Sequence, residues 1–324
     1  MINRNYSLGK IVCICPACGR KTFKPYVDAD GVPLDALECG RCNREINCQY
    51  HCPPREYFNR HPGIDKNSVK PVRKLPILYE TPSFIEWKYL QYSMNKPLFS
   101  NLTVYLKVLF GMNAVFDACR RMYVGYSPSF GGSVIFWYVD HMGNIRTGKN
   151  MGFTIDGHRC KNPNQIYWVH KNRNIASENF VMRQCFFGSH QLMNSDTDRC
   201  TLLFVESEKT ALILTICLLA AGIGGYLVFA TGGSSNLKVD LNALKADIYY
   251  RWKPFMFRKL VLIPDADMYD SWRKTDLRAL HSPVHVINPS DLRLTGSMDV
   301  GDLLVADGLI GEIIDKIPQG FRPN

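Results

Sequence analysis

A short apolar run that stops at a carboxylate most constrains the fold of this chain. Residues 202–205 are apolar and are followed directly by Glu206, as in a buried parallel strand whose end reaches the rim of a sheet. Residues 207–221 are good helix formers, and a cluster of glycines ends the helix. A second apolar strand over 226–230 completes a strand–helix–strand unit, which predicts a parallel α/β sheet.

The same stretch allows one competing interpretation. Residues 211–230 carry no charge and are long enough to span a bilayer. However, glycines interrupt the run and no basic or tryptophan belt flanks it, so a buried helix and strand joined by a tight turn fit better. We therefore expect no membrane partner.

A third apolar run, residues 259–263, ends just before Asp265 and Asp267. Because the carboxyl ends of parallel strands share one edge of a sheet, we expect these two carboxylates to meet Glu206 there. Three oxygen donors without His or Cys suit a hard cation such as Mg²⁺ or Mn²⁺. Alternatively, a D-x-D after a strand can serve simply to cap the next helix, and that alternative stays open.

These residues resemble the Toprim domain shared by DnaG-type and phage primases, topoisomerases and some nucleases. The resemblance covers residues 199–310 and rests on VESEKTA, ATGGS and LIPDAD, and on the acidic stretch SMDVGDLL. It implies a Rossmann-like parallel sheet in which Glu206, Asp265 and Asp267 are catalytic metal ligands. It also implies that Asp302 supports the metal, with Asp299 as a secondary candidate. Three further residues are implied as nucleotide-binding, namely Lys209, Gly232 and Gly233.

Cysteines predict a second kind of metal site. The start of the chain lacks the apolar segment of a secretory signal, so we expect a cytoplasmic protein whose twelve cysteines are thiols or metal ligands. Two C-x-x-C pairs separated by 20 residues are typical of a four-thiolate zinc ribbon. The predicted ligands are Cys15, Cys18, Cys39 and Cys42. A redox-active pair is the alternative, and nearby residues that could substitute as ligands are Cys13, Cys48, His51 and Cys52.

Charge points to a polyanionic partner. The net charge is +10, and basic and aromatic residues alternate around the cysteine pairs. Cations that follow phosphates and rings that stack on bases suit single-stranded nucleic acid, although a solvated face around zinc explains the same residues. The residues concerned are Arg20, Lys21, Phe23, Lys24, Tyr26, Arg41 and Arg44.

The middle of the chain predicts a mixed α and β segment. Residues 102–110 and 113–122 have helical patterns, and residues 133–149 read as a hairpin whose second strand exposes Arg146 and Lys149. The G-x4-GK within this hairpin has Asn150 where a P-loop needs Ser or Thr, and no helix follows, which disfavours an ATPase. The segment resembles the basic subdomain of phage-type primases, which implies that Arg146, Lys149 and Lys161 bind nucleotide or template.

The order of these parts predicts an α/β multidomain protein. We expect a zinc ribbon over 1–56, a linker over 57–98, a basic subdomain over 99–195 and a Toprim domain over 196–324. The resemblance implies a primase that uses Zn²⁺ and Mg²⁺ or Mn²⁺ to join nucleoside triphosphates on a single-stranded DNA template of a phage, plasmid or mobile element. A separate replicative helicase would unwind the duplex. The alternatives are a Toprim nuclease and a non-catalytic accessory protein that binds single-stranded DNA.

Overall fold

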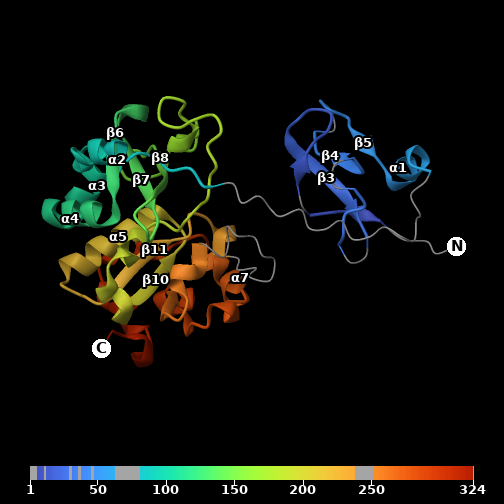
Figure 1. Cartoon of the computed structure of the whole chain (residues 1–324). Coiled ribbons are helices and arrows are strands. Elements are labelled where there is room, and N and C mark those ends of the chain that lie inside the picture. Colours follow the sequence, from blue (N-terminus) through green and yellow to red (C-terminus); the bar gives the residue numbers. More distant parts are fainter. Residues whose placement is uncertain are drawn as a thin grey trace. The chain divides into compact units, whose positions relative to one another are not determined.

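The computed structural model describes residues 6–10, 12–28, 31–35, 38–44, 47–62, 81–237 and 251–323. The chain divides into two compact units, residues 1–80 and 81–324 (Figure 1). Residues 63–80, which hold much of the predicted linker, lie outside the described residues.

The first unit is a small antiparallel sheet followed by a helix. The strands pair in the order β1-β3-β4-β5, and β2 pairs with the start of β3. Helix α1 crosses the predicted boundary at residue 56, and Tyr57 on this helix packs into the core of the first unit. The elements are β1 (Ser7–Leu8), β2 (Cys13–Ile14), β3 (Lys21–Val27), β4 (Gly40–Cys42), β5 (His51–Cys52) and α1 (Pro54–Arg60).

An antiparallel sheet with three helices begins the second unit. The strands pair in the order β6-β7-β8-β9, and the predicted hairpin is β7 and β8. Gly143, where the P-loop-like sequence starts, lies in the hairpin turn with a φ of +84°, and the rest of that sequence runs into β8. The elements are α2 (Trp87–Met94), α3 (Asn101–Phe110), α4 (Met112–Met122), β6 (Val124–Ser127), β7 (Ser133–Val139), β8 (Ile145–Met151) and β9 (Ile166–Trp168).

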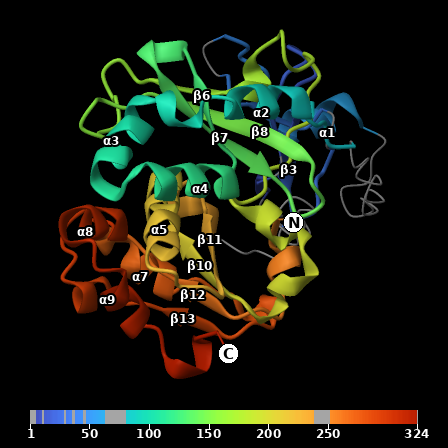
Figure 2. The same cartoon turned by 90° about the vertical axis from the view of Figure 1, so that its left-hand side faces the viewer.

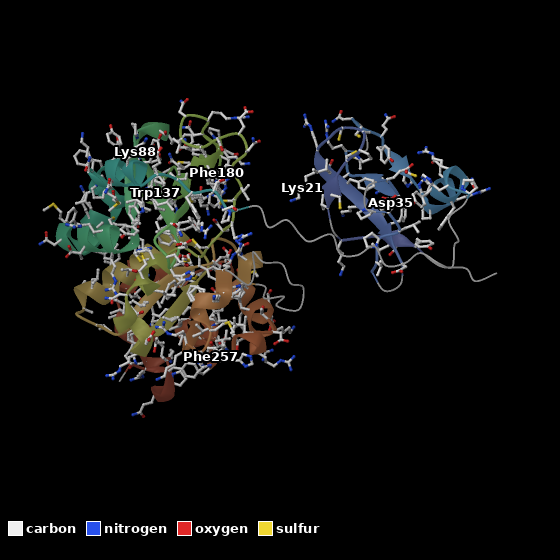
Figure 3. The ribbon with its side chains drawn as sticks, viewed as in Figure 1. Lys21, Asp35, Lys88, Trp137, Phe180 and Phe257 are labelled. Carbon is white, nitrogen blue, oxygen red and sulfur yellow. The ribbon has the colours of Figure 1, made fainter. Side chains whose placement is uncertain are left out.

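Helix α2 lies within the predicted linker but is anchored to this sheet. Trp137 of β7, labelled in Figure 3, is 1% exposed. Its indole N–H donates to Ser93 Oγ on α2 at 2.8 Å. A buried indole needs such a partner, so this hydrogen bond fixes α2 against the sheet.

The parallel sheet predicted from the apolar runs is present. Its strands lie in the order β11-β10-β12-β13, and each neighbouring pair is parallel. Ser207 caps α5, because its Oγ accepts the Thr210 N–H at 3.1 Å. The elements are β10 (Thr201–Val205), α5 (Glu208–Ala220), β11 (Tyr226–Ala230), β12 (Leu260–Leu262), α7 (Tyr269–Arg273), β13 (Val284–Val286), α8 (Val300–Asp307) and α9 (Ile310–Asp315).

Helix α5 joins the two sheets of the second unit into one core. Residues 210–218 are all buried, as expected for a helix that is apolar on every side. The helix contacts α4, α8 and β11, and Figure 2 shows it between α4 and the parallel sheet. Side chains alternate along β10: Leu203 faces this core, whereas Phe204 faces an aromatic cluster on the other side of the sheet. The predicted segments 99–195 and 196–324 therefore share a core.

The apolar stretch 211–230 is α5, a turn and β11 rather than a membrane span. None of the described helices combines the length and apolar character needed to cross a bilayer.

Candidate metal sites

Four sulfur atoms come together in the first unit. The Sγ atoms of Cys15, Cys18, Cys42 and Cys48 all lie within 4.8 Å of one another. Cys15 and Cys18 flank a tight turn in which the Gly19 N–H donates to the Cys15 carbonyl at 2.9 Å. Gly19 has a φ of +64°, a conformation that glycine adopts without strain, so this sequence can form the turn.

This cluster corrects the predicted ligand set at one position: the fourth sulfur is from Cys48, not Cys39. Cys39 precedes Cys42 by three residues on a chain that is entering β4, and side chains at odd separations along an extended chain point to opposite faces. Cys39 therefore packs with Leu34 and Cys52, away from Cys42.

The thiol environments fit a structural zinc ion. A hydrogen bond from the Arg20 backbone lowers the pKa of the Cys18 thiol to about 6. The Thr22 hydroxyl, 3.1 Å from Cys42 Sγ, is the largest cause of the lowered pKa of that thiol.

Burial raises the pKa of Cys39 to about 12. A hydrogen bond from the Tyr50 backbone lowers the pKa of the Cys48 thiol, but burial and hydrogen bonds with the other three cluster thiols outweigh it and raise this pKa to about 12 as well. The position of the sulfur atoms, rather than thiol pKa, therefore distinguishes Cys48 from Cys39, and the four clustered sulfurs are the donor set of a four-cysteine zinc site.

A row of polar side chains crosses the first unit. Lys24, Arg41 and His51 are direct neighbours across β3, β4 and β5. The Tyr26 hydroxyl is 2.9 Å from His51 Nε2, and the two rings stack with centroids 6.0 Å apart. Phe23, which we expected to stack on bases, is instead fully buried beside the cysteine cluster. Tyr26 and His51 are therefore the aromatic rings of this row.

The second unit gathers carboxylates at one edge of the parallel sheet. Glu206 directly follows β10, and Asp265 and Asp267 follow β12, its neighbour in the sheet. A third segment joins them because the Ala266 N–H donates to the Met298 carbonyl at 3.0 Å. This hydrogen bond brings the start of α8 to the same edge.

The pKa of Asp265 indicates how close these acids lie to one another. Loss of hydration on burial raises the pKa of its carboxyl group, and the neighbouring carboxylates of Asp299, Glu206, Asp267 and Asp302, in decreasing order, raise it further, to about 8. Like charges raise a carboxyl pKa in this way only when they are close. The oxygen donors of this cluster fit Mg²⁺ or Mn²⁺.

Of the two acids at the start of α8, Asp299 acts more strongly on Asp265 than the predicted Asp302 does. Asp299 accepts the Thr210 hydroxyl at 2.7 Å and the Asp302 N–H at 3.0 Å. The Asp302 carboxylate accepts the Asp299 N–H at 3.1 Å, which completes a capping box on α8. Both acids therefore have structural partners, and Asp299 is the better candidate ligand because it acts more strongly on Asp265.

Two predicted nucleotide-binding cations are engaged in ion pairs, contrary to their expected exposure. The side chains of Arg146 and Lys149 are each 12% exposed. Arg146 pairs with Asp140 at 2.6 Å, and Lys149 pairs with Glu208 at 2.8 Å. Both cations are thereby neutralised within the protein.

The four remaining predicted nucleotide-binding residues lie at different places in the second unit. The Lys209 ammonium donates to the Gly157 carbonyl at 3.0 Å. Gly232, with a φ of +74°, donates its N–H to the Glu206 carbonyl at 2.9 Å, and Gly233 follows it in the turn after β11. Lys161 lies in an exposed turn between β8 and β9.

Sequence reasoning missed Glu208 as a residue of interest. It is buried at the first position of α5, where an acidic residue usually remains in solvent and complements the helix dipole. Its position two residues after Glu206 was the available signal. Its partners come from β7 and β8, more than fifty residues away, and cannot be read from the local sequence.

Residues 100–266 match the family described as Domain of unknown function (DUF6371), and the chain belongs to this family. Residues 4–63 match a family described as a zinc beta-ribbon finger. Among curated proteins, none matches the chain.

Several solved primase structures are similar to parts of the chain. The primase fragment of the bacteriophage T7 primase-helicase is 14% identical, with a TM-score of 0.42 over 96% of this chain and 99% of that one. The RNA polymerase domain of Mycobacterium tuberculosis primase DnaG is 12% identical, with a TM-score of 0.44 over 72% and 81%. The E. coli primase catalytic core is 12% identical, with a TM-score of 0.44 over 71% and 77%. The functional assignment depends on the side chains at the sheet edge.

Proposed function

We propose that the chain is a primase-like nucleotidyltransferase whose second unit uses divalent metal held by carboxylates at the edge of the parallel sheet. One observation supports this most: Glu206 and Asp265 follow neighbouring parallel strands, and a hydrogen bond brings the start of α8 to the same edge. Burial and then four neighbouring carboxylates from these three segments raise the pKa of Asp265. Such a concentration of negative charge is unfavourable unless a cation occupies it. Active sites commonly contain groups with pKa values perturbed in this way.

In this proposal, Glu206, Asp265, Asp267 and Asp299 hold Mg²⁺ or Mn²⁺. A bound cation would supply charge stabilisation to the attacking and leaving oxygens of phosphoryl transfer. Glu206, Asp265 and Asp299 are half-buried and would anchor the cation, whereas the exposed Asp267 would reach toward substrate. The turn at Gly232 and Gly233 lies beside these acids and would accommodate phosphate close to the backbone.

The first unit would engage the single-stranded DNA template. Lys24, Arg41 and His51 form a row that suits phosphates, and Tyr26 offers a ring face to a base. Zinc would bind the cysteine cluster and fix the strands that carry this row. A separate helicase partner and replication of a mobile element remain parts of the proposal that follow from the primase resemblance.

Primer synthesis tests the proposal. Full-length protein is given single-stranded DNA, labelled ribo- or deoxyribonucleotides and Mg²⁺ or Mn²⁺. We expect short oligomers from the wild type and none from Asp265→Ala. Asp270→Ala is the matched control, because Asp270 lies only three residues after Asp267 in the first turn of α7, is exposed and pairs only weakly with Arg273 at 3.6 Å.

Other outcomes of this assay identify the alternatives. Equal yields from wild type and Asp265→Ala would contradict the site assignment. Nicking of DNA in Mg²⁺ or Mn²⁺ without nucleotides, lost in Asp265→Ala, would identify a nuclease. Binding of single strands that does not change with divalent metal, without synthesis or nicking, would identify an accessory protein.

A further inference from the structure

A buried ion pair lies next to the proposed metal ligands and has no role in the function proposed above. Lys149 Nζ is 2.8 Å from Glu208 Oε1 and 3.0 Å from Glu208 Oε2. The two side chains are 12% and 3% exposed. The Tyr138 hydroxyl also donates to Glu208 Oε1, and the Lys149 ammonium lies 5.7 Å from the centre of the Trp168 ring. Glu208 is thus fully neutralised and hydrogen-bonded, as a buried carboxylate must be.

This network contacts both segments that hold the backbone of Glu206. Glu208 itself begins α5, two residues after Glu206. The turn after β11 packs on the other side of the network: a Cβ at Gly232 would lie 2.6 Å from the Tyr138 hydroxyl and 3.4 Å from Glu208 Oε1. The Gly232 N–H in turn donates to the Glu206 carbonyl at 2.9 Å. Movement of the Glu208 side chain would therefore disturb Glu206 from two directions.

We propose that Lys149 and Tyr138 are positioning residues for the carboxylate site, acting through Glu208 and the Gly232 turn to fix Glu206. This inference rests on the proposed metal-binding function of that edge. It gives Lys149 a role different from the nucleotide contact expected from the sequence, since a phosphate would have to displace a two-point ion pair to reach it. The antiparallel sheet thereby determines the geometry of an active site that lies on the parallel sheet.

Mn²⁺ binding provides the test. Full-length, zinc-loaded protein is titrated with Mn²⁺, and free Mn²⁺ is measured by electron paramagnetic resonance. We expect Lys149→Met to weaken the affinity about 10-fold, in the range seen when residues that orient metal ligands are removed. Tyr138→Phe, which removes one hydrogen bond and no charge, should weaken it about threefold.

A double variant separates positioning from general damage. In Lys149→Met combined with Glu208→Gln, both charges of this ion pair are removed together and the amide oxygen can still accept the Tyr138 hydroxyl. We expect this variant to bind Mn²⁺ within about threefold of the wild type. If Lys149→Met does not fold, the Mn²⁺ affinities of Tyr138→Phe and the double variant still test the proposal.

Arg146→Met is the matched control. Arg146 lies on the same strand as Lys149, is equally exposed and pairs with a buried acid, Asp140, at the hairpin turn. We expect a similar loss of thermal stability with Mn²⁺ affinity unchanged within about twofold. Wild-type affinity in both Lys149→Met and Tyr138→Phe, or equal losses in Lys149→Met and Arg146→Met, would overturn the inference.

Asp265→Asn distinguishes this failure from failure of the proposed function. If Asp265→Asn abolishes Mn²⁺ binding while Lys149→Met and Tyr138→Phe retain it, only the positioning inference is wrong. If Asp265→Asn binds Mn²⁺ as the wild type does, the carboxylate edge is not the metal site and the proposed function fails with it.

Discussion

The two units differ in whether the metal would stabilise the fold or the fold forms the metal site. In the first unit, Cys15 and Cys42 are themselves core residues, and the two apolar clusters each contain only a few side chains. Such a small core is marginal without a metal or disulfide. In the second unit, helix α5 and two sheets form an extensive core, and the carboxylates lie at its edge. Metal would therefore stabilise the first fold, whereas the second fold creates the metal site.

Among the changes that we predict, loss of a cysteine ligand should produce the largest difference in stability between the two units. We expect Cys48→Ser to lose zinc and unfold the first unit, because binding of structural zinc contributes about 10 kcal/mol or more to folding in such small domains. Zinc content and the chemical-shift dispersion of the first unit are the measurements. The second unit should keep its thermal transition, since its core does not depend on zinc.

Cys39→Ser is the control for that prediction, and it separates the observed ligand set from the one expected by spacing. Cys39 packs away from the cluster, so we expect one equivalent of zinc to remain bound. Loss of zinc in Cys39→Ser and its retention in Cys48→Ser would show that the two C-x-x-C pairs are the ligands after all.

Acid should weaken the second unit through a buried histidine. Burial lowers the pKa of His190 to about 4, and its Nε2 lies 2.8 Å from the Arg121 carbonyl. The unfolded chain, with a pKa near 6.5, binds the proton more readily, so His190 should lower the free energy of unfolding by about 2–3 kcal/mol as pH falls from about 6.5 to 4. Protonation of Asp265, whose pKa is raised, acts in the opposite direction over this range, so the histidine's share is the difference between the wild type and a variant without it. Urea unfolding at several pH values measures this.

His190→Gln sharpens the prediction, because glutamine keeps an N–H donor for the Arg121 carbonyl but does not titrate. We expect its free energy of unfolding to fall by about 2 kcal/mol less over the same pH range. An identical pH dependence in the variant and the wild type would mean that another group causes the acid sensitivity.

Removing a repelled charge should stabilise the metal-free second unit. Asp265→Asn relieves the burial and like-charge repulsion that raise the pKa of this carboxyl group, so we expect the free energy of unfolding at pH 8 to rise by about 1–2 kcal/mol. Thermal unfolding in a chelator that leaves zinc in place gives the value. Destabilisation by this change would indicate that Asp265 has a structural partner rather than a catalytic role.

The smallest effect should come from the hydrogen bond that fixes Asp299. Thr210→Val removes the hydroxyl that donates to Asp299 at 2.7 Å. We expect the free energy of unfolding to fall by about 1 kcal/mol, because a buried acceptor loses one donor. Mn²⁺ affinity should weaken severalfold if Asp299 is a ligand and should be unaffected if it only caps α8.

The sequence predicted best where local pattern and fold agree. Residues 201–230 form the expected strand, helix and strand because the apolar runs, the cap at Ser207 and the glycine turn all specify the same structure. The rule that parallel strands share one edge was enough to bring Glu206 and Asp265 together. The order of strands in the sheet was not needed for that step.

Prediction was wrong where the outcome depends on tertiary structure. The spacing of Cys39 and Cys42 suggested a second turn, but the chain there enters β4 and separates the two sulfurs. The charge of Lys149 suggested a surface contact, but β8 packs against the start of α5 and buries it with Glu208. Pairings between distant segments of this kind leave no local signal in a single sequence.

The position of a bound Mn²⁺ ion tests the central claim most directly. Crystals of the full-length protein soaked in Mn²⁺ would locate the ion by its anomalous scattering. The account predicts a peak in direct contact with the carboxylates of both Glu206 and Asp265. A peak that contacts neither residue, or no peak at this edge of the sheet, would contradict it.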